Sequence, residues 1–298
     1  MLAGHIDEIG VIVTHIDGDG FLYIDGIGGW DSQVLVGQRI RFLCRTEQIV
    51  GVVGKKPIHL MKLDERDKVS KIADLWVDVG AESRQQAIEM GVRVGDPGVI
   101  DGKMVRLGSK LIASRAIDNR IGAYVVLEAL RIVTNSREKL TAEVAAIATT
   151  QEEIAHQGGG ARTSAYSFDP QVALVVDVTF ATDAPQVEKK QTGEHKLGSG
   201  PVLTRGSASN AVLFEKLAEI ADREGIPYTI QASPRYTATD ADAIYLSRSG
   251  VATGIVSVPN RYMHSPNEIV SLEDLDATAR LLAALILDLD ASSDFVPR

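Results

Sequence analysis

The chain has 298 residues, 45% of them hydrophobic and 24% charged, which is ordinary globular composition for one large domain or two domains. The net charge of −9 disfavours nucleic-acid partners, because a basic patch is the usual footprint of nucleic-acid binding. No apolar run reaches the roughly 18 residues that a transmembrane helix requires, so no membrane partner is expected.

Cysteine usage and the first residues bear on the cellular compartment. Cys44 is the single cysteine, which excludes an internal disulfide framework and a cysteine-rich zinc site. The N-terminal sequence MLAGHIDEIG lacks the basic and apolar regions of a signal peptide. A cytoplasmic location is therefore expected.

The region from residue 9 to residue 107 has the pattern of a small β domain. Short runs rich in β-branched residues, separated by frequent glycines, are IGVIVTHI, GFLYIDGI, QRIRFLC and QIVGVVGK. This pattern is typical of short strands joined by tight turns. One helix is predicted within the region, from Ser83 to Met90.

From Leu107 onward, strand and helix patterns alternate along the chain. Apolar residues recur at helical spacing from Ile121 to Val133, and again in SNAVLFEKLAEIADREG and LEDLDATARLLAALILDL. Strands are predicted at EVAAIATT, ALVVDVTFA, YTIQAS and ATGIVSVP. The alternation predicts an α/β fold with a mostly parallel sheet that is covered by helices on both faces.

A set of histidines and carboxylates lies where strands are predicted to end, which is where an open α/β sheet gathers its ligands. Its members are His5, Asp7, Asp118, Glu152, Glu153, Asp177 and His264. Two imidazoles and several carboxylates form a ligand set that suits zinc, cobalt or manganese.

Several of these residues also have a structural alternative. In a strand the side chains of His5 and Asp7 share one face, so the carboxylate can orient a metal-binding imidazole. The alternative is a structural histidine with a hydrogen bond at a strand edge. Asp118 precedes a predicted helix, where it is either the helix N-cap or a carboxylate that bridges two cations.

Glu152 and Glu153 follow a predicted strand, where adjacent carboxylates repel each other and lose solvation unless cations neutralise them. One can bind metal while its neighbour takes a proton from metal-bound water; the alternative is an exposed acidic pair at a helix start. The glycine run 158–160 favours a tight loop beside the site.

The last two candidates differ in their surroundings. Asp177 ends an apolar run where an unpaired charge would be costly, which favours a metal ligand. His264 lies in a loop after a predicted strand, and such loops commonly carry function, although a lone loop histidine is usually structural.

Six motifs resemble, in the same order, those of the M42 metallo-aminopeptidases, which include tetrahedral and glutamyl aminopeptidases and some members called endoglucanases. The motifs are AGHIDEIG, IDNRIG, TTQEEIAHQGGG, VVDVT, LGSGP and RYMHSPNE. The resemblance spans almost the whole chain. It implies a zinc-peptidase-like α/β sandwich with an inserted small β-rich domain. The expected catalytic domain covers 1–10 and 108–298, and the inserted domain, through which family members dimerise, covers 11–107.

The resemblance also implies two divalent cations per subunit, zinc or cobalt. The first would be held by His5, Asp118 and Asp177, and the second by Asp118, Glu153 and His264. Glu152 would be the general base and Asp7 the partner that orients His5. The peptide bond between Asp118 and Asn119 would be cis.

Three features depart from the family pattern. The residues that normally precede the first strand are absent, so we expect a catalytic domain without its N-terminal part, with consequences for stability and assembly. Ala155 and His156 stand where a glycine and a leucine-like residue usually follow the two glutamates. The segment 237–241 replaces Gly-Gly-Thr-Asp-Ala, and its Asp240 is a candidate for substrate binding.

The sequence thus predicts a two-metal aminopeptidase that removes N-terminal residues from short peptides and forms homo-oligomers, either dimers or dodecamers. The alternatives are a metal-dependent deacylase or carboxypeptidase-like hydrolase, and an inactive, N-terminally truncated assembly protein. Glycoside hydrolysis is disfavoured, because two adjacent glutamates cannot flank a sugar bond. The sequence does not indicate the preferred N-terminal residue or the native metal.

Overall fold

The structure is a computed structural model that describes residues 1–45, 47–136, 140–154 and 158–297. The chain forms two compact units. The first comprises Met1–Asp7, Val105–Met263 and Glu268–Arg298, and the second comprises Glu8–Met104 and His264–Asn267. Ala155 and His156, which depart from the family pattern, lie outside the described residues. Within the described part, no helix is long and apolar enough to cross a bilayer.

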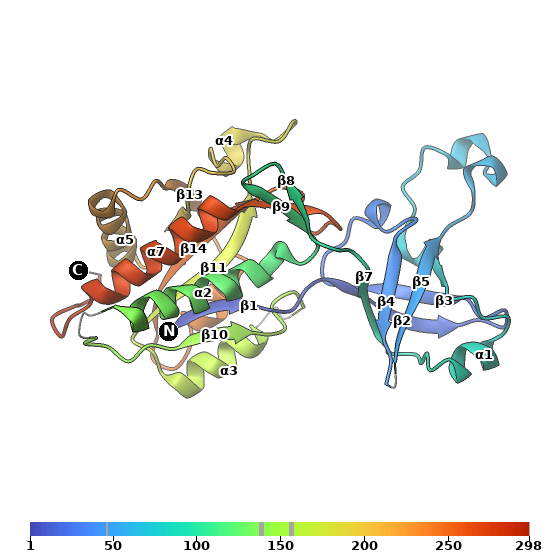
Figure 1. Ribbon diagram of the computed structural model, residues 1–298, viewed down its shortest axis with the longest axis horizontal. Coiled ribbons are helices and arrows are strands. Elements are labelled where there is room, and N and C mark those ends of the chain that lie inside the picture. The colour runs from blue at the N-terminus through green and yellow to red at the C-terminus, as the bar shows by residue number, and fades with distance from the viewer. Residues whose placement is uncertain (46, 137–139, 155–157, 298) are drawn as a thin grey trace. The chain divides into compact units, whose positions relative to one another are not determined.

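A six-stranded sheet forms the centre of the first unit, in the order β10-β1-β11-β14-β12-β13 (Figure 1). Its strands are β1 (Leu2–His5), β10 (Ala146–Thr149), β11 (Val172–Phe180), β12 (Val202–Gly206), β13 (Thr229–Ser233) and β14 (Ala252–Asn260). Neighbouring strands run parallel except β12 and β14, which are antiparallel. The predicted α/β class and the mostly parallel sheet are confirmed.

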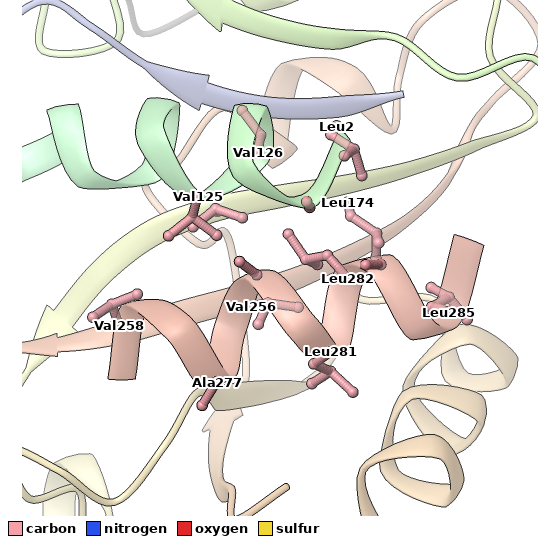
Figure 2. Close-up of a cluster of buried hydrophobic side chains, with 14 of the residues drawn as sticks. Leu2, Val125, Val126, Leu174, Val256, Val258, Ala277, Leu281, Leu282 and Leu285 are labelled. Carbon is pink, nitrogen blue, oxygen red and sulfur yellow. The ribbon is translucent and has the colours of Figure 1, made fainter. Parts of the chain in front are cut away.

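Successive strand residues point to opposite sides of the sheet, so the apolar strands present a hydrophobic face on each side. Helices cover both of these faces. In β11, Leu174 and Val176 join one core cluster, whereas Ala173 and Val175 join another. Figure 2 shows the first cluster, in which strand residues meet side chains of the covering helices. The helices on that face are α2 (Ile117–Asn135), α5 (Ala211–Glu224) and α7 (Leu272–Asp288), and those against the other are α3 (Gly159–Phe168) and α6 (Ala241–Ile244).

Smaller elements complete the first unit. A three-stranded antiparallel sheet contains β8 (Val105–Leu107), β9 (Leu111–Ser114) and β15 (Glu268–Ser271). The short helix α4 (Lys189–Thr192) precedes β12.

The second unit is a closed barrel in the order β2-β3-β6-β5-β4-β7. Its strands are β2 (Gly10–Ile16), β3 (Leu22–Ile27), β4 (Arg39–Leu43), β5 (Gln48–Gly54), β6 (Trp76–Asp78) and β7 (Pro97–Ile100). The predicted helix is α1 (Arg84–Glu89), which the Ser83 side chain caps. Four 3-10 turns connect the strands: η1 (Ser32–Val34), η2 (Ile58–Leu60), η3 (Leu63–Glu65) and η4 (Ile72–Asp74).

Two local structures differ from the sequence expectation. Helix α2 begins at Ile117 instead of Ile121, although its backbone is not helical at Asp118 and Asn119. The glycine run predicted as a loop forms the start of α3. A Cβ on Gly159 would lie 2.6 Å from the Cβ of Gln151, so the glycines let α3 pack closely against the segment that leads to the two glutamates.

Candidate metal centre

His5 is the focus of the polar cluster in the first unit. It ends β1, where it lies opposite Thr149 of β10, and only 1% of it is exposed. Its Nε2 is 3.2 Å from Oδ1 of Asp118, 3.6 Å from Oε2 of Glu152 and 3.7 Å from Oδ1 of Asp177. One buried imidazole nitrogen therefore faces three carboxylates from three separate segments of the chain.

Asp7 lies on the other side of the imidazole. Nδ1 of His5 is 3.2 Å from the backbone oxygen of Asp7 and 3.5 Å from its carboxylate. The two carboxylate oxygens of Asp7 accept the backbone N–H groups of Glu152 and Glu153, each over 3.3 Å. When the proton is on Nδ1, His5 donates to Asp7 and directs its Nε2 lone pair toward the other carboxylates, an orientation common among metal-bound histidines.

Asp118 lies at the start of α2, where the chain leaves helical geometry. Its backbone N–H donates to Oε2 of the buried residue Glu268 over 2.8 Å. The following peptide bond, to Asn119, is cis, as the resemblance implied. The next side chain, that of Asn119, donates to the carbonyl oxygen of Val176, the residue before Asp177.

Two sets of side chains bring possible ligand atoms within 4.8 Å of one another: His5 with Asp118 and Glu153, and His5 with Glu152 and Asp177. Both sets combine an imidazole nitrogen with carboxylate oxygens, which are ligands of zinc and of other divalent cations. Buried carboxylates so close together repel one another unless a cation offsets their charge. The donor set therefore fits a divalent metal.

The protonation equilibria reflect this crowding. Burial alone would lower the pKa of His5, but its hydrogen bonds to Asp118 and Asp7 raise that pKa far above the usual value. The pKa of Glu152 is raised to about 8, mainly by burial; His5 opposes the change, and Glu153 and other nearby carboxylates add to it. Burial also raises the pKa of Asp177.

Asp7 is the exception among these carboxyl groups. Burial by itself would raise the pKa of Asp7, but the hydrogen bond with His5 and the two backbone amides lower it below the usual value. Asp7 is therefore held as a carboxylate, the form that can accept these bonds.

Asp240 lies beside the cluster at the start of α6, with only 2% of its surface exposed. Its Oδ2 accepts a hydrogen bond from the hydroxyl of Thr149, while Oδ1 is buried without a partner among the described residues. Burial raises the pKa of Asp240 to about 6. Asp240 therefore contacts the last residue of β10.

His264 belongs to the second unit. Its Nδ1 is 2.8 Å from the backbone oxygen of Gly29, and its φ is 59°. Its assignment as a ligand of the second cation stays a prediction.

The sequence predicted no role in the site for Glu268 or for the side chain of Asn119, which both support Asp118 or its neighbours. Both stand inside quoted motifs, in RYMHSPNE and IDNRIG, but their partners are distant along the chain. The signal available was their position beside the predicted ligands: Asn119 follows Asp118, and Glu268 lies four residues after His264.

The family model for the M42 glutamyl aminopeptidases matches residues 1–281. The lysyl aminopeptidase of Pyrococcus furiosus is 39% identical over 299 aligned positions, which cover 100% of this chain and 83% of that protein. The TET aminopeptidase of a marine sediment archaeon of the Thaumarchaeota is 35% identical, with a TM-score of 0.92 over 97% of this chain and 81% of that one.

A second solved structure is a TET peptidase of Pyrococcus horikoshii that can assemble into a tetrahedron or a large octahedral shell. It is 31% identical, with a TM-score of 0.83 over 97% of this chain and 83% of that one. The chain therefore belongs to the M42 glutamyl aminopeptidase family, whose members are hydrolases that act on peptide bonds.

Proposed function

We propose that this chain is a two-metal aminopeptidase that removes the N-terminal residue from short peptides. The observation that carries the proposal is the approach of three carboxylates, from Asp118, Glu152 and Asp177, to one buried nitrogen of His5. Bound divalent cations would polarise the scissile carbonyl and lower the pKa of the hydrolytic water.

The ligand assignment follows the family pattern. His5, Asp118 and Asp177 would hold one cation, and Asp118, Glu153 and His264 would hold the other. The short distances from His5 to Asp118 and Asp177 support the first set. The grouping of Asp118 with Glu153 supports part of the second.

Glu152 is the proposed general base. It takes a proton from the attacking water and passes it to the leaving amine, a role that typically contributes about 10²–10⁴-fold in rate. Its backbone N–H donates to Asp7, which limits the movement of this turn relative to His5. Asp7 acts through His5 and the glutamates as the residue that orients them. Substrate binding by Asp240 remains a prediction.

The experiment combines metal reconstitution with a substrate panel. The protein is stripped with a chelator, reloaded with zinc or cobalt, and assayed on lysyl, glutamyl and leucyl p-nitroanilides, because the relatives include both lysyl and glutamyl aminopeptidases. Metal-dependent release is expected from free amino-acid derivatives. Release of acetate from N-acetylated derivatives would instead indicate a deacylase-like hydrolase.

Two substitutions test the general base. Glu152→Gln should lower turnover by about 10²-fold or more while both metals stay bound. Glu219→Gln, on an exposed position of α5, is the matched control and should leave turnover unchanged. Wild-type turnover in Glu152→Gln would exclude the assigned role. Full metal content in the wild type without activity on any peptide would support an inactive assembly protein.

We further propose that the chain forms homo-oligomers through the second unit. Ile58, Leu60 and Leu63 in its 3-10 segments are 53%, 70% and 78% exposed, and a group of neighbouring exposed apolar side chains is typical of a protein–protein interface. The solution mass from light scattering should be at least twice the 32.0 kDa of one chain. The double substitution Leu60→Glu, Leu63→Glu should reduce it, and a monomeric wild-type protein would contradict the proposal.

A further inference from the structure

The side chain of Asn119 joins the two segments that carry Asp118 and Asp177. Asn119 is fully buried, and its Nδ2 donates to the carbonyl oxygen of Val176 over 2.8 Å. Its Oδ1 accepts the backbone N–H of Gly122 over 3.0 Å. One carboxamide therefore connects the start of α2 to β11 at the residue before Asp177.

The bond to Gly122 is a helix cap. Because the backbone is not helical at Asp118 and Asn119, the regular part of α2 begins after them, and a side-chain oxygen that accepts the N–H three residues later is the usual N-cap arrangement. A Cβ on Gly122 would lie 2.3 Å from Oδ1 of Asn119. The carboxamide thus occupies a closely fitted space.

The bond to Val176 has a different consequence. Serine and aspartate cap helices about as well as asparagine, so capping alone does not require an amide. The amide adds an N–H donor that reaches the carbonyl oxygen beside Asp177. Glu268 holds the backbone of Asp118 from another direction. Two hydrogen bonds therefore hold the Asp118–Asn119 segment in place: the bond from the Asp118 backbone to Glu268, and the bond from the Asn119 side chain to the residue before Asp177.

We propose that Asn119 is a positioning residue that sets the spacing between the carboxylates of Asp118 and Asp177 for cation binding. The proposal rests on the proposed function, since it takes these two carboxylates as metal ligands. Both already face Nε2 of His5, at 3.2 and 3.7 Å. Loss of a hydrogen bond that supports a ligand typically weakens metal binding by about 10- to 100-fold.

Asn210 provides a matched control, because it makes the same pair of bonds at the start of α5. Its Oδ1 accepts the N–H of Leu213 over 2.9 Å, and its Nδ2 donates to the carbonyl oxygen of Phe295 over 2.8 Å. Its backbone N–H donates to Thr253 near the start of β14, whereas Asp177 lies opposite Ser257, further along that strand.

The test compares Asn119→Ser with Asn210→Ser in the full chain. Each variant keeps a hydroxyl cap and loses the amide donor. Zinc affinity of the chelator-stripped proteins is measured by competition with a chromophoric chelator, and melting temperature is measured separately. Asn119→Ser should bind zinc about 10- to 100-fold more weakly than the wild type and show altered absorption bands when loaded with cobalt. Asn210→Ser should lower only the melting temperature.

The outcomes separate this proposal from the proposed function. Wild-type zinc affinity in folded Asn119→Ser would overturn the positioning role and leave the metal assignment standing. A wild-type protein that binds neither zinc nor cobalt would overturn both. If Asn119→Ser does not fold, Gly122→Ala displaces the same carboxamide through its Cβ. Unchanged zinc affinity in that variant would equally overturn the proposal.

Discussion

Replacement of Asp7 by asparagine tests whether a single carboxylate aligns the imidazole with the glutamate pair. Asp7 contacts Nδ1 of His5 and accepts the N–H groups of Glu152 and Glu153. Asparagine has nearly the same shape but only one side-chain oxygen. Its NH₂ group must therefore face at least one N–H donor, and at least one of the three contacts is lost whichever way the amide is turned.

The size of the effect follows from these contacts. A hydrogen bond to a charged group contributes about 1.5–3 kcal/mol, and the 3.3 Å length of the two amide bonds places Asp7 at the lower end. Loss of a residue that orients a metal-bound histidine typically weakens metal binding by about 10- to 100-fold, which corresponds to about 1.4–2.8 kcal/mol. The two routes give the same magnitude.

Zinc affinity and kcat/KM at limiting and saturating zinc measure this effect. Asp7→Asn should lose activity most strongly at limiting zinc and recover part of it at saturation. Asp17→Asn is the control, because Oδ1 of Asp17 also accepts two backbone N–H groups, from Asp19 and Phe21, in an exposed turn of the second unit. Zinc affinity of Asp7→Asn within about twofold of the wild type would refute the reasoning, given that twofold is under 0.5 kcal/mol, roughly.

Three further predictions concern stability. Asp274→Ala should lower the free energy of unfolding in urea by about 2–4 kcal/mol, because it leaves the N–H groups of Gly198 and Gly200 without their carboxylate acceptor. The control, Asp276→Ala on the exposed side of α7, should change it by under about 0.5 kcal/mol. Burial opposes ionisation of Asp183, but hydrogen bonds from Arg261 hold its pKa below the usual range. Asp183→Asn should therefore be less stable than the wild type by about 1.5–3 kcal/mol above roughly pH 4, and this difference should shrink as the pH falls further. A pH-independent difference would contradict this. Leu281→Ala should lower the calorimetric stability by about 2–5 kcal/mol because its side chain is fully buried, and a loss under about 1 kcal/mol would show that the site repacks.

The periodicity of the sequence predicts the main elements because their burial is regular. Strand β11 was predicted from the run that ends near Phe180, and α7 from apolar residues at helical spacing. The rule that ligands gather at the carboxyl ends of parallel strands anticipated the position of His5, which ends β1. It anticipated Asp177 only in part, because Asp177 lies inside β11, which continues to Phe180. These features depend on short stretches of sequence and a general rule of sheet architecture.

The contacts that position the ligands could not be predicted in the same way. The bond from Asp118 to Glu268 joins residues 150 positions apart, and that from Asn119 to Val176 joins residues 57 positions apart. Polar residues in the sequence do not reveal such partners, because one side chain can be satisfied by many different backbone groups. The prediction of a loop at the glycine run was wrong for a related reason. The sequence does not show that Gly159 packs against Gln151 at the start of a helix.

Glycine at position 4 connects the packing of the sheet to the geometry of the centre. A Cβ on Gly4 would lie 2.5 Å from the backbone carbon of Gly122, so β1 and α2 approach each other at a distance that only glycine permits. His5 follows Gly4, and Asp118 lies at the start of the same helix, with Nε2 and Oδ1 at 3.2 Å. A side chain at Gly4 must push the strand and the helix apart, and because these two elements carry His5 and Asp118, it must also separate the ligands. The glycine and the histidine of the motif AGHID thus serve the same geometry, one by its contact with the helix and the other by its contact with the carboxylate.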